Sequence, residues 1–240
     1  MKGTTPAGAR SEQEAAAWVR AMFGRVAHRY DLANHLLSFN IDRYWRAHTV
    51  ARVREVLMRP DARVLDICCG TGDLVRALSR AHPAGAAVMG SDFCHPMLVA
   101  ARAKVGAGRL FEADALRLPL ADRSLDLITV AFGFRNLANY QAGLREMRRV
   151  LRPGGMAAIL EFSQPPNAWF GALYGFYSQR VLPVIGGALS GSRDAYAYLP
   201  ESVRKFPSPE ELTEMMRAAA FAEVKFERLT GGIVALHVAK

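Results

Sequence analysis

The stretch Arg63-Val-Leu-Asp-Ile67, followed directly by Cys68-Cys-Gly-Thr-Gly-Asp73, decides the fold of this chain. A short apolar run breaks into a glycine-containing turn, and a helical run from Leu74 to Ala81 follows it. This order is typical of a buried strand that enters a helix through a ligand-binding loop. Glycines let such a loop turn tightly and approach a ligand without a Cβ in the way. The stretch therefore predicts the first strand of an open α/β sheet.

The same alternation of strand and helix continues along the chain. Further strands are expected at 86–90, 109–112, 125–130, 156–162, 224–228 and 234–239, with a turn over 230–232 between the last two. Helices are expected between most of them, including one opened by Pro96 and one opened by Pro209. Alternating strands and helices indicate βαβ units. The sequence thus predicts an α/β fold with a doubly wound, mostly parallel sheet of seven strands.

The flanking segments predict one domain with two additions. Residues 1–12 are small and polar and are expected to be disordered, and 13–240 are expected to form a single domain. Helical spacing in 14–30, and from Asp42 as a plausible N-cap to Leu57, predicts an N-terminal helical lid over 13–59. Residues 165–200 are aromatic and glycine-rich and predict an irregular insert.

Composition restricts the class of protein. The chain has 240 residues and a net charge of +9, from 31 basic and 22 acidic residues. That excess reflects either an arginine-rich composition or a basic surface for an anionic partner. No apolar run reaches the roughly 18 to 20 residues that span a bilayer, and no signal segment is apparent, so a cytoplasmic protein is expected. The three cysteines form no CxxC pair, and no metal site is predicted.

Arginines mark one face of the second predicted helix, at Arg43, Arg46, Arg52 and Arg54. Such a face is either simply solvated or attracted to an anionic membrane surface.

Acidic residues follow three successive predicted strands. Asp66 lies in the first strand before Gly70-Thr71-Gly72, Asp92 ends the second strand, and Asp114 follows the third. Strand ends of this kind meet at one edge of the sheet, where ligands bind in open α/β folds. The sequence therefore predicts a nucleoside site there, although Asp92 and Asp114 each have an alternative role in a cap or turn.

Two nucleotide chemistries compete for this layout. A dinucleotide site requires a third glycine after Gly70-Thr71-Gly72, but Asp73, Leu74 and Val75 follow instead. Asp73 also brings negative charge to the helix N-terminus where a pyrophosphate would bind. S-adenosylmethionine, which has an ammonium and no phosphate, fits better. Asp66 or backbone carbonyls near Gly70 would bind the ammonium, Asp92 the ribose hydroxyls and Asp114 the adenine amino group.

Several more restricted motifs carry a resemblance to a known family. They are Tyr30-Asp-Leu-Ala-Asn34, Phe132-Gly-Phe-Arg-Asn136, Arg149-Val-Leu-Arg-Pro-Gly-Gly155 and Leu229-Thr-Gly-Gly-Ile-Val-Ala-Leu-His237. In these residues the chain resembles the ubiquinone/menaquinone biosynthesis C-methyltransferases (UbiE/MenG type). The resemblance implies the class I S-adenosylmethionine-dependent methyltransferase fold, with cofactor contacts at Thr71, Asp92, Asp114 and Ala115.

The resemblance also implies carbon methylation of a demethylated, prenylated quinol, without separating menaquinone from ubiquinone precursors. Ionising the ring phenol at pH 7 costs about 4 kcal/mol. Arg135 is the candidate for stabilising the phenolate, and Asn136 for orienting the ring oxygen. A structural ion pair is the alternative role for Arg135.

The remaining acceptor contacts are predicted on the lid and the insert. Tyr30, Asp31 and Asn34 would cover the acceptor, or would lock the N-terminal helices to the sheet. Tyr174 and Tyr177 lie at helical spacing with other apolar residues and would line a groove for the prenyl tail, or would pack in an ordinary core.

Other functions stay open. The first is a methyltransferase for another small phenolic or lipid acceptor, which would share the cofactor site. The second is an RNA methyltransferase, against which the absence of an appended RNA-binding module argues, so no nucleic-acid partner is expected. The third is a non-catalytic protein with this fold. Because a prenyl tail resides in lipid, we expect peripheral association with the inner face of the cell membrane. A homodimer stays open.

Overall fold

The fold is an open sheet of seven strands in the order β3-β2-β1-β4-β5-β7-β6. The computed structural model describes the chain except for residues 1–2, 83–87, 107–108, 182–183 and 185–192. β7 pairs antiparallel with β5 and β6, and the other pairs are parallel. The strands are β1 (Val64–Ile67), β2 (Val88–Asp92), β3 (Leu110–Glu112), β4 (Leu125–Ala131), β5 (Leu151–Phe162), β6 (Lys225–Leu229) and β7 (Val234–Ala239). The predicted mostly parallel sheet is confirmed.

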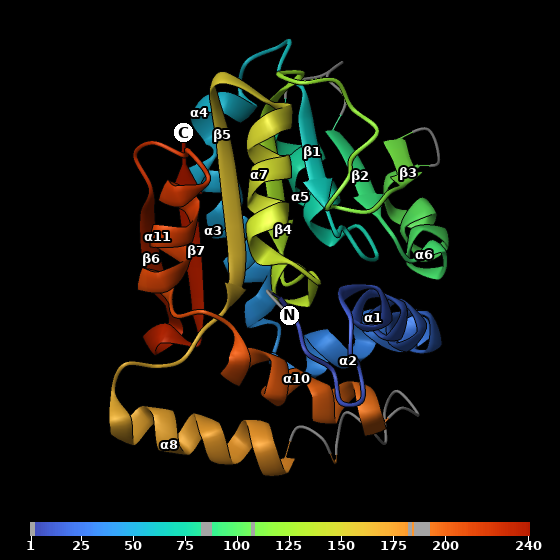
Figure 1. The fold of residues 1–240 in the computed structure, drawn as a ribbon, viewed down its shortest axis with the longest axis vertical. Coiled ribbons are helices and arrows are strands. Elements are labelled where there is room, and N and C mark those ends of the chain that lie inside the picture. Colours follow the sequence, from blue (N-terminus) through green and yellow to red (C-terminus); the bar gives the residue numbers. More distant parts are fainter. Residues whose placement is uncertain (1–2, 83–87, 107–108, 182–183, 185–192) are drawn as a thin grey trace.

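Helices cover both faces of this sheet (Figure 1). Leu144 of α7 (Tyr140–Val150) and Met216 of α11 (Pro209–Ala218) belong to an apolar cluster on one face. On the other face, a second cluster joins α3 (Ile41–Arg52), α4 (Arg54–Leu57), α5 (Asp73–Ala81) and α6 (His95–Val105) to the sheet. Burial of apolar side chains on both faces explains why the central strands read as nearly continuous apolar runs.

The strand order reverses between β1 and β4, which are direct neighbours. In an open α/β sheet, the crevice beyond the carboxyl ends of the strands at this point is the usual ligand site. Helices α1 (Glu12–Val26), α2 (Tyr30–Leu37) and α10 (Arg193–Lys205) lie across this edge of the sheet (Figure 1). The segment predicted as a lid therefore lies where a ligand would enter.

The described part of the N-terminal tail packs on the domain, in contrast to the disorder predicted for residues 1–12. Thr4 is buried, and its backbone N–H donates to the carbonyl of Leu137 at 2.8 Å. Its hydroxyl lies 2.6 Å from that of Tyr198 on α10. Small polar residues gave no periodic signal, so only these long-range contacts reveal the ordered position.

The insert predicted as irregular over 165–200 is largely helical where it is described. It contains α8 (Ala168–Phe176), the π-helical turn η4 (Tyr177–Val181) and the first part of α10, while 182–183 and 185–192 lie outside the described residues. The side chain of Asn167 accepts a hydrogen bond from the N–H of Phe170 and caps α8. The helical spacing of Tyr174 and Tyr177 thus belongs to α8 and η4, although Gly171 and Gly175 lower the helix propensity of this segment.

Candidate active site

Two adjoining cavities lie at the carboxyl edge of the sheet. The smaller cavity, of about 80 Å³, is lined by residues that follow β1, β2 and β3, and we call it the cofactor cavity. The larger, of about 530 Å³, lies among the N-terminal helices, α8 and α10, and we call it the acceptor cavity. Four residues line both cavities: Phe23, Tyr30, Arg46 and Phe132. A group bound in one cavity can therefore reach a group bound in the other.

Most of the predicted cofactor residues meet in the cofactor cavity. They are Asp66, Gly70, Thr71, Asp92, Asp114 and Ala115. Gly72 does not belong to this lining. It takes φ +83° as the N-cap of α5, and a Cβ there would lie 3.3 Å from the Cβ of Ala101. Gly72 thus serves the turn and the packing of α5 against α6 rather than ligand contact.

Asp92 connects the loops that follow β1 and β2. One of its carboxylate oxygens accepts the N–H of Gly70 at 2.9 Å, and the other accepts the N–H of Cys94 at 2.8 Å. Burial raises the pKa of Asp92, although these backbone hydrogen bonds lower it. Cys94, not Asp92, is the N-cap of α6. A carboxylate offers about four lone-pair sites, so Asp92 can still accept a hydrogen bond from a ribose diol.

Asp66 is a buried carboxyl group at the floor of the same cavity. Thr129 donates its hydroxyl to Asp66 at 2.7 Å. Burial raises the pKa of Asp66 to about 7, although the hydrogen bond from Thr129 and the charge of Arg46 lower it. Asp114 accepts the N–H of Leu116 at 2.9 Å, which is the turn contact left open by the sequence, while it also lines the cavity.

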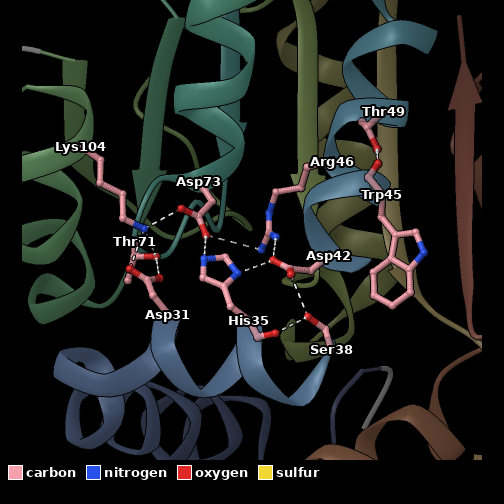
Figure 2. Close-up of polar contacts among 10 residues, drawn as sticks. All are labelled: Asp31, His35, Ser38, Asp42, Trp45, Arg46, Thr49, Thr71, Asp73 and Lys104. Carbon is pink, nitrogen blue, oxygen red and sulfur yellow. Dashed lines mark hydrogen bonds and ion pairs between the residues drawn. The ribbon is translucent and has the colours of Figure 1, made fainter. Parts of the chain in front are cut away.

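A cluster of charged side chains joins the N-terminal helices to the glycine turn (Figure 2). Thr71 donates its hydroxyl to Asp31 at 2.5 Å, and Lys104 of α6 lies 2.6 Å from the carboxylates of both Asp31 and Asp73. Asp31 lines neither cavity. The structure therefore places Asp31 in the tertiary lock that was the alternative to an acceptor contact.

The second half of this cluster is centred on Asp42 (Figure 2). Asp42 lies in the first turn of α3, where Asn40 and not Asp42 is the N-cap. Its carboxylate accepts the hydroxyl of Ser38 at 2.7 Å, lies 2.8 Å from Nδ1 of His35 and pairs with Arg46. Burial raises the pKa of Asp42, but Ser38, Arg46 and His35 outweigh it and hold that pKa below its usual value.

Arg135 is buried in an ion pair with Glu161, the alternative that the sequence left open. Its Nη1 lies 2.9 Å from Glu161, and its Nε donates to Ser202 at 3.2 Å. The guanidinium also lies 5.3 Å from the ring centroid of Phe162, and Arg135 lines the acceptor cavity. The structure thus supports a structural role and leaves the predicted catalytic role a prediction.

Asn136 faces the cofactor cavity and not the acceptor cavity. Its side-chain oxygen accepts the hydroxyl of Tyr198 at 2.9 Å, and its amide donates to the carbonyl of Phe132 at 3.4 Å. Both contacts fix the loop after β4. An acceptor ring would therefore have to enter the cofactor cavity to bring its oxygen into contact with Asn136.

The acceptor cavity brings together four of the five residues predicted to contact the acceptor: Tyr30, Asn34, Tyr174 and Tyr177. Burial raises the pKa of Tyr30, and it raises that of Tyr174 to about 12, so both phenols are neutral at pH 7. Tyr177 donates its hydroxyl to the carbonyl of Leu37 at 2.8 Å and so ties the end of α8 to α2.

Arg46 lies in a different environment from the one that the sequence predicts. It is expected on an arginine face that is either solvated or attracted to an anionic membrane surface, but its side chain is largely buried and lines both cavities. The sequence contained a signal for this burial. One helix face carries Asp42, Trp45, Arg46 and Thr49, and its other three members are buried in the structure. Arg52, on the same predicted arginine face, pairs with Glu227.

Solved structures with this arrangement are methyltransferases and their relatives. A methyltransferase from Thermotoga maritima, described as SAM-dependent and a possible histamine N-methyltransferase, superposes with a TM-score of 0.64 at 20% identity over 91% of this chain and 98% of that chain. The [4+2]-cyclase SpnF superposes with a TM-score of 0.66 at 17% identity over 98% of each chain. The fold is therefore that of the class I S-adenosylmethionine-dependent methyltransferases.

The chain belongs to the ubiE/COQ5 methyltransferase family, which it matches over residues 9–240. It is 50% identical to a demethylmenaquinone methyltransferase of Thermus thermophilus, over 90% of this chain and 98% of that one. It is 46% identical to a ubiquinone/menaquinone biosynthesis C-methyltransferase of Syntrophotalea carbinolica, over 91% of this chain and 92% of that one. The family suggested by the sequence motifs is thereby confirmed.

Binding of S-adenosylmethionine should release a proton near pH 7, because Asp66 is partly protonated there in the free protein. Below its raised pKa the carboxyl is neutral and attracts no ammonium; above it the carboxylate does. We expect release of about half a proton per ligand at pH 7 and affinity that rises from pH 6 to pH 8. Calorimetry in buffers of different ionisation enthalpy measures this release. In Asp66→Asn it should vanish, and equal release in both proteins would exclude Asp66.

Arg135→Gln should destabilise the protein by about 3–5 kcal/mol, because it leaves Glu161 buried without its partner. The double variant Arg135→Gln with Glu161→Gln removes both charges and should recover much of this loss in thermal denaturation. Single-turnover methyl transfer in the double variant then isolates the catalytic role. A rate lower by about 10²-fold or more would support phenolate stabilisation, whereas a wild-type rate would leave Arg135 purely structural.

Proposed function

We propose that the chain transfers a methyl group from S-adenosylmethionine to a ring carbon of a demethylated, prenylated quinol. The bound donor supplies an electrophilic methyl group on its sulfonium. The observation that carries the proposal is the common wall of the two cavities, formed by Phe23, Tyr30, Arg46 and Phe132. The names of the relatives, demethylmenaquinone methyltransferase and ubiquinone/menaquinone biosynthesis C-methyltransferase, support a quinol as the acceptor.

The acceptor cavity has the size and lining that a quinol with part of its tail needs. Its volume of about 530 Å³ lies within the usual range for small-molecule sites. Apolar side chains such as Met22, Val26 and Phe162 line it together with a few polar groups, including Asn34. Holding the ring carbon beside the methyl group is itself worth up to about 7–11 kcal/mol in favourable cases.

Methyl transfer to a short-chain demethylmenaquinol tests the proposal. The reduced quinol should gain one methyl group on carbon, identified by mass and NMR, whereas the oxidised quinone should not react because its ring is a poor nucleophile. The ubiquinol precursor and a panel of other phenols are run in parallel. Asp92→Ala should abolish the gain by weakening donor binding, since hydrogen bonds to charged groups are worth about 1.5–3 kcal/mol. Turnover of other phenols with none of either quinol would contradict the acceptor.

We further propose that the protein associates peripherally with membranes through α8. Among the described residues, no helix is long and apolar enough to cross a bilayer. Gly171, Tyr174 and Gly175 of α8 line the acceptor cavity, whereas Trp169, Leu173 and Phe176 point away from it and are 56–81% exposed. A helix that is apolar on all sides needs an apolar partner on its outer face.

The charges around α8 favour an anionic lipid surface as that partner. No Asp or Glu occurs between Glu161 and Asp194, and exposed Arg180 continues the outward face of α8 by one turn. The exposed ring of Phe39 lies 6.3 Å from that of Tyr177 and extends the apolar surface to the mouth of the acceptor cavity. The arginine face of α3 and α4 contributes less than the sequence suggested, because Arg46 is buried and Arg52 is paired.

The triple variant Trp169→Ser, Leu173→Ser and Phe176→Ser should lose flotation with anionic liposomes. Each fully buried large apolar side chain contributes about 1.5–3 kcal/mol, so vesicle affinity should fall at least ~10-fold. High salt should weaken the wild-type interaction through Arg180. The control, Met58→Ser with Val99→Ser, removes exposed apolar side chains from the C-cap of α4 and from α6 and should float normally. Equal flotation of both variants would place the membrane contact elsewhere.

A further inference from the structure

The charges that line the cofactor cavity are unequal in number. Four carboxylates belong to its lining: Asp66, Asp73, Asp92 and Asp114. Among the described lining residues, Arg46 is the single Lys or Arg. A methyl donor with two positive groups, the ammonium and the sulfonium, and one negative group, the carboxylate, is complementary in sign to this excess of carboxylates over cations. One cation in the cavity therefore faces one anion on the ligand.

Arg46 also lies at the correct end of the cavity for that anion. Asp92 and Asp114 follow β2 and β3, where the ribose and adenine are expected, whereas Asp66 and Gly70 belong to β1 and its loop. The methionyl end of the donor is expected beside Asp66. Arg46 lines the cavity together with Asp66, and its Nη2 lies 4.0 Å from Asp73, which directly follows Gly72.

The hydrogen bonds of Arg46 leave one edge of its guanidinium available (Figure 2). Nη1 donates to Asp42, which Ser38 and His35 also hold. Nη2 lies 4.0 Å from Asp73, which is too long for a hydrogen bond. Nε donates to none of the described residues. The Nε and Nη2 hydrogens form the parallel pair that matches the two oxygens of a carboxylate.

Asp73 does not prevent an anion from binding there. Its carboxylate lies 2.6 Å from Lys104, which also pairs with Asp31, and 3.7 Å from Nε2 of His35, so Lys104 offsets part of its charge. The guanidinium lies 5.5 Å from the ring centroid of Phe132, a residue that lines both cavities. The available edge is thus held on the common wall by Asp42 on one side and an aromatic ring on the other.

We propose that Arg46 binds the carboxylate of the methionyl end of S-adenosylmethionine through Nε and Nη2. Asp42 is the positioning residue that holds the guanidinium in this orientation. The inference rests on the proposed methyl donor but not on the quinol acceptor. Because Arg46 belongs to α3, donor binding would tie the N-terminal helices to the glycine turn and complete the wall against which the acceptor is held.

Calorimetric binding of two donors tests this contact without any turnover. S-adenosylmethionine has the carboxylate, and decarboxylated S-adenosylmethionine keeps the ammonium and sulfonium but lacks it. Wild-type protein should prefer the first ligand by about 10- to 100-fold, the usual contribution of hydrogen bonds between charged groups. Arg46→Gln should abolish the preference by weakening binding of the first ligand alone. Arg46→Lys, which keeps the charge but loses the paired hydrogens, should give an intermediate preference.

Arg43→Gln is the matched control, because Arg43 is an exposed residue of the same helix that lines neither cavity. It should keep the wild-type preference. An unchanged preference in Arg46→Gln, or an equal loss of both ligands, would overturn the proposal. If Arg46→Gln does not fold, an unchanged preference in Arg46→Lys would also overturn it. Wild-type protein that binds neither ligand contradicts the donor itself, and one that binds both but methylates no quinol contradicts only the acceptor.

Discussion

The charged cluster between the N-terminal helices and the glycine turn is the constraint on which both cavities depend. Thr71 and Lys104 hold Asp31 of α2, while Lys104 also holds Asp73 at the start of α5. Tyr30 and Arg46, on the same N-terminal helices, line both cavities. Because these side chains are partly buried, salt screens the attraction between them less than it would at a fully exposed site. Release of the cluster would therefore open the cofactor cavity and remove one wall of the acceptor cavity together.

The sheet and the cofactor residues could be predicted because their signals are local. Apolar runs that end in glycine-containing turns identify the strands. Parallel pairing of these strands then places Asp66, Asp92 and Asp114 at one edge of the sheet, so no side-chain contact has to be known in advance. The helix α8 gave a weaker signal, because only the helical spacing of residues such as Tyr174 and Tyr177 indicated it. One face of α8 lines the acceptor cavity and the opposite face is apolar and exposed. The helix therefore lacks the polar face that makes an amphipathic helix easy to recognise in a sequence.

Charged residues on the lid and in the loop after β4 were the hardest to place from sequence, for a physical reason. An arginine on a helix is solvated by default, and only a partner decides otherwise. Arg46 has Asp42 one turn before it, a local signal, whereas the partner of Arg135 lies 26 residues away on β5. Asp31 meets Thr71 across 40 residues. Such pairs can be identified only once the fold is known, because the topology brings their elements together. They give Asp31 and Arg135 structural roles at positions where the sequence predicted contacts with the acceptor.

The sheet and the helices that cover its edge contribute different parts of the site. The chain superposes over 91–98% of its length on solved chains that are only 17–20% identical, one of them described as a cyclase, so this fold does not by itself select a reaction. The acceptor cavity, in contrast, is formed mainly by α1, α2, α3, α8 and α10, which lie outside the sheet. The family match begins at residue 9 and so includes these N-terminal helices. The helices that cover the sheet edge thus supply most of the lining of the acceptor cavity, and the charged cluster ties them to the glycine turn after β1.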